Sequence, residues 1–139
     1  KVKLGLGEEL TESDRVNILS GIRDYQQGDT ISSQDFWNGL KDDKSYNVVW
    51  TKRSLKNAVS IKNYLVKKFS RREVPRFETL LKQFELTVSN FPTLYPESLS
   101  QKRLRRAVIH KNTTVYYIFD KNKVTVVAMK DNRQQEASK

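Results

Sequence analysis

Basic side chains gather in the C-terminal third of the chain, where predicted strands begin and end. Four of them open the first of these strands and two follow the last: Lys102, Arg103, Arg105, Arg106, Lys130 and Arg133. An arginine can hold a phosphate or a carboxylate through two parallel hydrogen bonds, and a lysine adds a point charge. We expect Arg105 and Arg133 to be at least partly exposed and near one another on the open side of the sheet, where they would bind an anionic target.

The residues that other site chemistries need are scarce. The chain has no cysteine and a single histidine, His110, and its carboxylates are not clustered at metal-ligand spacing. We therefore expect no disulfide, no thiolate chemistry, no metal site and no cofactor. His110 stands at a predicted strand end beside Lys111, which favours a solvated turn histidine over a general base.

Three apolar runs should position these residues, and they cover 104–110, 114–119 and 124–129. Their β-branched and aromatic side chains suit a half-buried sheet, and the Asn and Asp residues between them suit tight hairpins. The sequence therefore predicts an antiparallel meander. Because side chains alternate along a strand, Arg105 and Arg106 should face opposite sides. Tyr116 and Tyr117 should alternate too, with one in the core and the other lining a groove.

A short strand at 46–50 and two amphipathic helices precede the meander. Thr51 can cap the first helix, whose apolar residues recur at helical spacing: Leu55, Ala58, Ile61, Leu65 and Phe69. Pro75 fits only a first turn, so the second helix should start near 71–74, and Pro92 should end it after an apolar face from Val74 to Phe91. The predicted fold is α+β in the order β-α-α-β-β-β, with a helical hairpin packed on one side of a small antiparallel sheet.

Charge divides the chain near residue 45. Residues 1–45 hold 6 Lys and Arg against 9 Asp and Glu, a net charge of −3, and the rest holds 20 against 7, a net charge of +13. An acidic segment at 1–45 followed by a basic domain at 46–139 suggests two pieces, of which the domain should attract a polyanion or an acidic partner. No apolar run is long enough to cross a bilayer, so no membrane partner is expected.

The acidic segment predicts two short helices that have no core of their own. Thr11 and Asp14 form a capping-box pattern before the first helix, Gly28 can end it, and the second should start at Ser32. The first helix is expected to present Val16, Leu19, Ile22 and Tyr25 on one face. Because short helices are marginal alone, a further surface must cover the apolar residues of the segment: Leu19, Ile22, Tyr25, Ile31, Phe36, Trp37 and Leu40. The segment is either an ordinary extension of the domain or a partner-derived piece that folds onto it.

Several short motifs follow one another along the basic domain. They are Val49-Trp50-Thr51 before a Lys-rich helix, Phe91-Pro92, Leu104-Arg105, the run 108–114, Tyr116-Tyr117 and Asp131-Asn132-Arg133-Gln134. In this order and spacing, the domain resembles the RelE/ParE family of bacterial type II toxins, and the runs 104–112 and 131–134 resemble its plasmid-stabilisation members. The stretch 18–32 is similar to the C-terminal segment of antitoxins in such operons, with a helix, a Gly, an Ile-Ser turn and a second short helix.

The resemblance implies a growth-inhibiting toxin of the bacterial cytoplasm, with a cognate antitoxin as partner and one of two targets. RelE-like members cut mRNA on the ribosome, and for that activity the resemblance suggests Arg105, His110, Tyr117 and Arg133. ParE-like members bind DNA gyrase without known nuclease chemistry, and the residues expected to bind the target are then Arg103, Arg105, Lys130 and Arg133.

Two departures favour ParE-like binding of gyrase. Ala107 and Thr114 stand where ribonuclease members carry further Lys or Arg, and neither His-Tyr nor a terminal Tyr follows Arg133. The mRNA endoribonuclease is the alternative, and a non-toxic RNA-binding domain is a third.

An antitoxin tail fused to its toxin would explain the acidic segment, its apolar residues and the absence of a Met before Tyr46. We expect 11–40 to lie across the basic domain and neutralise it. Buried apolar side chains would supply the affinity, and Asp24, Asp29 and Asp35 would assist encounter. The joint at 41–45 either tethers the segment to its own domain or passes it to a neighbouring chain, which would give an exchanged homodimer.

Overall fold

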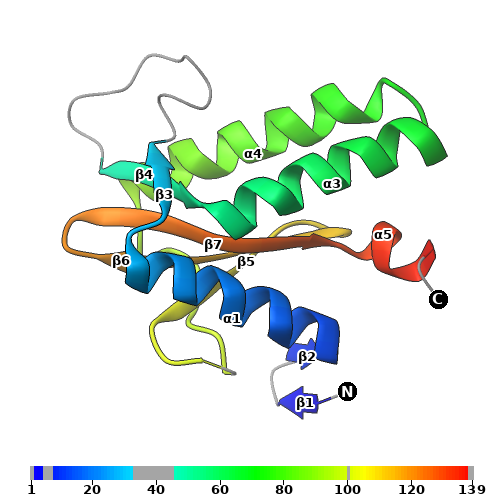
Figure 1. Ribbon diagram of the computed structural model, residues 1–139. Coiled ribbons are helices and arrows are strands. Elements are labelled where there is room, and N and C mark those ends of the chain that lie inside the picture. Colours follow the sequence, from blue (N-terminus) through cyan, green and yellow to red (C-terminus); the bar gives the residue numbers. More distant parts are fainter. Residues whose placement is uncertain (1, 5–7, 33–45, 100, 138–139) are drawn as a thin grey trace.

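The computed structural model describes residues 2–4, 8–32, 46–99 and 101–137, which form four helices and two sheets (Figure 1). The N-terminal part comprises β1 (Val2–Leu4), β2 (Glu8–Leu10), α1 (Glu12–Gln27) and β3 (Thr30–Ser32). The basic domain comprises β4 (Asn47–Thr51), α3 (Lys52–Lys68), α4 (Glu73–Asn90), β5 (Leu104–His110), β6 (Thr113–Asp120), β7 (Lys123–Asp131) and α5 (Asn132–Ala137). The predicted order β-α-α-β-β-β is present, followed by the unpredicted α5.

The main sheet is mixed, so the expected small antiparallel sheet is wrong. Its strand order is β3-β4-β7-β6-β5, and β4 runs parallel to β7, with Val48 opposite Val124 and Trp50 opposite Val126. A parallel pair needs a long connection, and α3, α4, β5 and β6 supply it. β3 pairs antiparallel with β4, with Thr30 opposite Thr51. The stretch predicted as an Ile-Ser turn is therefore an edge strand.

Local signals set the helix ends much as expected. The Thr51 Oγ1 accepts a hydrogen bond from the Ser54 N–H and caps α3. Thr11 and Asp14 form both hydrogen bonds of a capping box at α1, and Gly28 ends that helix with a left-handed φ of 76°. Phe69 and Phe91, predicted on the apolar faces, lie at the helix ends and are 51% and 64% exposed, because each follows the last buried turn.

Helices cover both faces of the sheet (Figure 1). α3 and α4 lie over one face and enclose a core that includes Trp50, Leu65, Leu81 and Tyr117. α1 lies across the opposite face above a second core with these members: Leu10, Ile18, Leu104, Tyr116, Ile118, Val127 and Ala128. Tyr116 and Tyr117 do face opposite layers, but both are buried, so neither lines a groove.

The predicted second short helix, with Phe36, Trp37 and Leu40, lies outside the described residues. None of the helices in the described ranges has the length and apolar character needed to cross a membrane.

Candidate functional site

The seam between α1 and the sheet is an extensive contact between the described part of the acidic segment and the basic domain. Gly21 packs directly on β7, where an added Cβ would overlap the carbonyl group of Val127. This approach places Ile18, which is 4% exposed, among the apolar side chains of the second core, and Ile22 and Tyr25 pack against its border. A helix lies this close to a strand only where it presents a residue without a side chain.

Polar contacts join the same two surfaces across 95 to 116 residues of sequence. The Lys130 Nζ lies 2.9 Å from Asp14 Oδ2, and the two side chains are 13% and 2% exposed. Asn17 donates from Nδ2 to the carbonyl oxygen of Met129 at 3.2 Å. The Tyr25 hydroxyl donates to Asp120 Oδ2 at 2.8 Å. The seam is therefore fitted in charge and hydrogen bonding as well as in shape.

The C-terminal half of α1 also caps the start of α3. Asp24 Oδ2 accepts the Arg53 backbone N–H at 2.7 Å, and Arg53 Nη2 donates to Ser20 Oγ at 2.9 Å. The Lys52 N–H donates to the carbonyl oxygen of Asp29 at 3.2 Å. The first N–H groups of a helix have no partner within it and carry partial positive charge, which favours a carboxylate there. Asp24 thus binds a helix terminus, whereas the sequence predicted only a steering charge for it.

The contact between Tyr25 and Asp120 shifts the pKa of both groups. Burial, together with the hydrogen bond to Asp120, raises the pKa of Tyr25 above its ordinary value. The hydrogen bond from Tyr25, assisted by Arg103, lowers the pKa of the Asp120 carboxyl. Both shifts favour the pair as found, with a neutral phenol and an ionised carboxylate.

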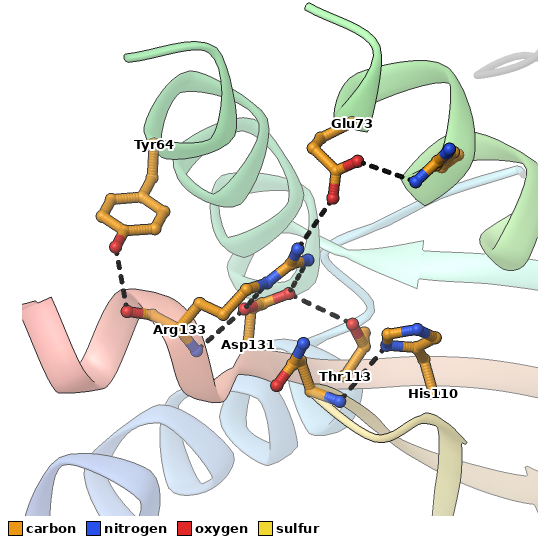
Figure 2. Close-up of polar contacts among 8 residues, drawn as sticks. Tyr64, Glu73, His110, Thr113, Asp131 and Arg133 are labelled. Atoms are coloured by element: carbon orange, nitrogen blue, oxygen red, sulfur yellow. Dashed lines mark hydrogen bonds and ion pairs between the residues drawn. The ribbon is translucent and has the colours of Figure 1, made fainter. Parts of the chain in front are cut away.

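Arg133 lies at the start of α5 in a closed cluster of charges (Figure 2). Its Nε and Nη2 donate to the two carboxylate oxygens of Asp131 at 3.0 and 2.9 Å, and its Nη1 donates to Glu73 Oε1 at 3.0 Å. Thr113 Oγ1 donates to Asp131 Oδ2 at 3.1 Å, and the Tyr64 hydroxyl donates to the Arg133 carbonyl oxygen at 3.0 Å. Hydrogen bonding to Asp131 raises the pKa of Arg133. Two carboxylates thus occupy the donors that the sequence assigned to a target.

Arg105 is also engaged within the fold. Its side chain is 20% exposed, and its Nη1 donates to the Tyr95 carbonyl oxygen at 2.7 Å. It stands opposite Tyr117 on the face of the sheet that α3 and α4 cover. Arg106 stands opposite Tyr116 on the α1 side, so the predicted alternation of the two arginines is correct.

The residues proposed for mRNA cleavage do not form one site. Arg105 and Tyr117 lie near the start of β5, whereas His110 ends that strand, which separates them by about 16 Å along the strand. His110 is exposed, and its Nδ1 accepts the Asn112 N–H at 3.3 Å in the turn after β5. Burial raises the pKa of Tyr117 to about 12, and its hydroxyl donates to the Pro92 carbonyl oxygen at 2.7 Å. The expectation that Arg105 and Arg133 lie together is wrong, because they occupy opposite ends of the sheet.

The other predicted residues divide by exposure. Arg103 has a side chain that is 73% exposed, 3.7 Å from Asp120, whereas α1 covers Lys130. Among the expected contacts of the segment, Ile22 and Tyr25 pack on the second core. Leu19 is 53% exposed, so its predicted contact is wrong, and Ile31 on β3 is 37% exposed. Val16, predicted on the same face, is 51% exposed.

Sequence reasoning missed the residues that make the seam. The capping-box pattern explains Asp14 without its contact to Lys130, and the spacing of large apolar residues does not point Ile18 or Gly21 toward the domain. A glycine inside a helix lowers helix stability, so its presence there is a sequence signal of a close contact.

Comparison with protein-family models and with curated proteins gives no match to this chain. Within the described ranges, no three His, Cys, Asp or Glu side chains are grouped so that they could hold a metal ion.

Proposed function

We propose that the basic domain is a growth-inhibiting toxin of RelE/ParE type from a type II toxin–antitoxin module, and that the acidic segment is an antitoxin piece that neutralises it. The observation that carries this proposal is the seam. A helix from the acidic segment covers one sheet face of the basic domain through apolar, ionic and hydrogen-bonded contacts. An antitoxin segment would need such contacts to silence its toxin.

The proposed target is DNA gyrase, which the domain would inhibit by binding. Dispersal of Arg105, Tyr117, His110 and Arg133 over two ends of the sheet disfavours concerted acid–base catalysis. A tyrosine with a pKa of about 12 is also a poor proton acceptor at neutral pH. Release of α1 would uncover Lys130 and the apolar face around Tyr116 and Val127, which together form a surface for an acidic protein partner.

Growth of bacteria that express the full chain tests the proposal. Ile18→Asp places a charge in the second core and should release α1, whereas the exposed Leu19→Asp adds the same charge on the outer face of the same helix. The first variant should arrest growth and the second should not. Normal growth with a soluble, folded Ile18→Asp variant would contradict the neutralising role.

The released variant also separates the targets. Gyrase supercoiling and mRNA cleavage on ribosomes should be measured side by side with Ile18→Asp. Loss of supercoiling without cleavage is the expected result. Cleavage without loss of supercoiling would favour the endoribonuclease. If neither effect is seen, the non-toxic RNA-binding domain is the favoured alternative.

A further inference from the structure

The turn between α3 and α4 carries a dense group of basic side chains, which we call the hairpin tip: Lys67, Lys68, Arg71, Arg72 and Arg76, with Phe69 among them. All six are exposed. The one acidic residue of this stretch, Glu73, is bound to Arg76 and Arg133. Among the described residues, none forms an ion pair with Lys67, Lys68, Arg71 or Arg72. These four cations are exposed to solvent.

Helix energetics account for only part of this charge. Lys67 and Lys68 lie in the last turn of α3, where cations are favourable. Arg71 and Arg72 immediately precede α4, where the positive end of the helix dipole disfavours them, and Arg72 makes no side-chain cap. Their position is therefore unfavourable for the fold alone and becomes favourable when an external anion lies against the tip.

Phe69 adds an aromatic surface to the same tip. Its ring lies edge-on to Tyr64, with centroids 5.9 Å apart, and the Arg133 guanidinium carbon lies 5.3 Å from its centroid. These contacts hold the ring in place while the side chain remains 51% exposed. An ordered aromatic ring within a basic patch is the arrangement on which unpaired bases stack.

Three basic residues on or next to the sheet are differently placed, because Lys130, Arg133 and Arg105 are each engaged within the fold. Figure 1 places the turn between α3 and α4 on the side of the sheet opposite α1. α1 therefore does not cover the tip.

We propose that the hairpin tip binds the phosphate backbone of single-stranded nucleic acid, with Phe69 stacking on a base. The four unpaired cations contact successive phosphates. This binding is independent of the growth-inhibiting role, because it needs neither release of α1 nor any residue of the seam.

Fluorescence anisotropy of the full chain with a labelled single-stranded oligonucleotide, and with a duplex of the same sequence, tests the proposal. The tip variant carries Lys67→Gln, Lys68→Gln, Arg71→Gln and Arg72→Gln. A matched control replaces two lysines and two arginines that are exposed elsewhere: Arg15→Gln, Arg23→Gln, Lys102→Gln and Lys111→Gln. Both variants lose the same charge.

The tip variant should bind on the order of 100-fold more weakly in about 0.1 M salt. The slope of log affinity against log salt should fall in magnitude by about 3, because each phosphate contact to a single strand contributes about 0.7. The control should lose far less affinity. Phe69→Leu should weaken single-strand binding about tenfold and leave duplex binding unchanged.

Three results would overturn the proposal. They are equal losses in the tip and control variants, binding that prefers the duplex and ignores Phe69→Leu, and no salt-dependent binding by the full chain. If the natural partner of the tip is an acidic protein, the full chain should show no salt-dependent binding to the oligonucleotide. None of these results predicts whether Ile18→Asp is toxic, so the binding proposal and the toxin proposal can fail separately.

Discussion

Replacement of Gly21 by alanine should loosen α1 from the sheet. The new Cβ would overlap the Val127 carbonyl group, and β7 cannot yield easily because β4 and β6 pair with it on both sides. An extra methyl group in a packed interior costs about 1–3 kcal/mol, and a main-chain neighbour places this site near the upper end, at about 3 kcal/mol. Better helix propensity offsets about 1 kcal/mol. The net loss of about 2 kcal/mol corresponds to a roughly 30-fold larger population with α1 undocked.

Native-state hydrogen exchange measures that population directly. Amides of α1 should exchange about 30-fold faster in Gly21→Ala, and amides of β6 and β7 that open only by global unfolding should accelerate by up to the same factor, because global unfolding also relieves the strained contact. Leu19→Ala is the matched control, because it alters the same helix at an exposed position. Unchanged α1 protection in Gly21→Ala, or a larger effect of Leu19→Ala, would refute the proposed contact face.

Three further substitutions test individual contacts. Asp14→Ala should destabilise the chain by about 3 kcal/mol in urea unfolding, because it leaves the largely buried Lys130 unpaired, and adding Lys130→Met should restore part of that loss. Tyr25→Phe should be less stable than wild type by a margin that is steady from about pH 5 to 9 and shrinks below about pH 4. The reason is that Tyr25 lowers the pKa of Asp120, so its stabilisation is lost as that carboxylate gains a proton. Tyr117→Phe should lower the free energy of unfolding by about 1–3 kcal/mol. Added to Ile18→Asp, it should leave the toxicity of that variant unchanged at neutral pH, because a pKa of about 12 keeps the Tyr117 hydroxyl protonated and unable to act as a base.

Elements with strong local signals were predictable. β5 matches its predicted range of 104–110, and α3 begins directly after Thr51, because a β-branched run and a capping side chain act on their own neighbourhood. The parallel pairing of β4 with β7 was not predictable in the same way. It joins Trp50 to Val126 across the whole domain, and no local pattern distinguishes it from an antiparallel partner.

The apolar face of α1 shows why periodicity alone can mislead. Val16, Leu19, Ile22 and Tyr25 recur at helical spacing, but the helix turns Ile18 and Gly21 toward the sheet and exposes Val16 and Leu19. A pattern of large apolar residues ignores glycine, although close packing of a helix on a strand depends on it. The prediction that Arg105 and Arg133 form one site was wrong for a related reason. Arg105 and Arg133 could be assigned to strand ends, but which end of the sheet each occupies depends on the register between distant strands.

The two surfaces constrain how the acidic segment can act. With a net charge of −3 against +13, it cannot cancel the charge of the domain. In the seam it removes one lysine from solvent, places Asp24 at the start of α3 and buries a face built from Leu104, Tyr116 and Val127. Its effect on a partner of the domain therefore comes from covering that face. The binding proposed for the hairpin tip, which lies on the other side of the sheet from α1, does not depend on uncovering that face.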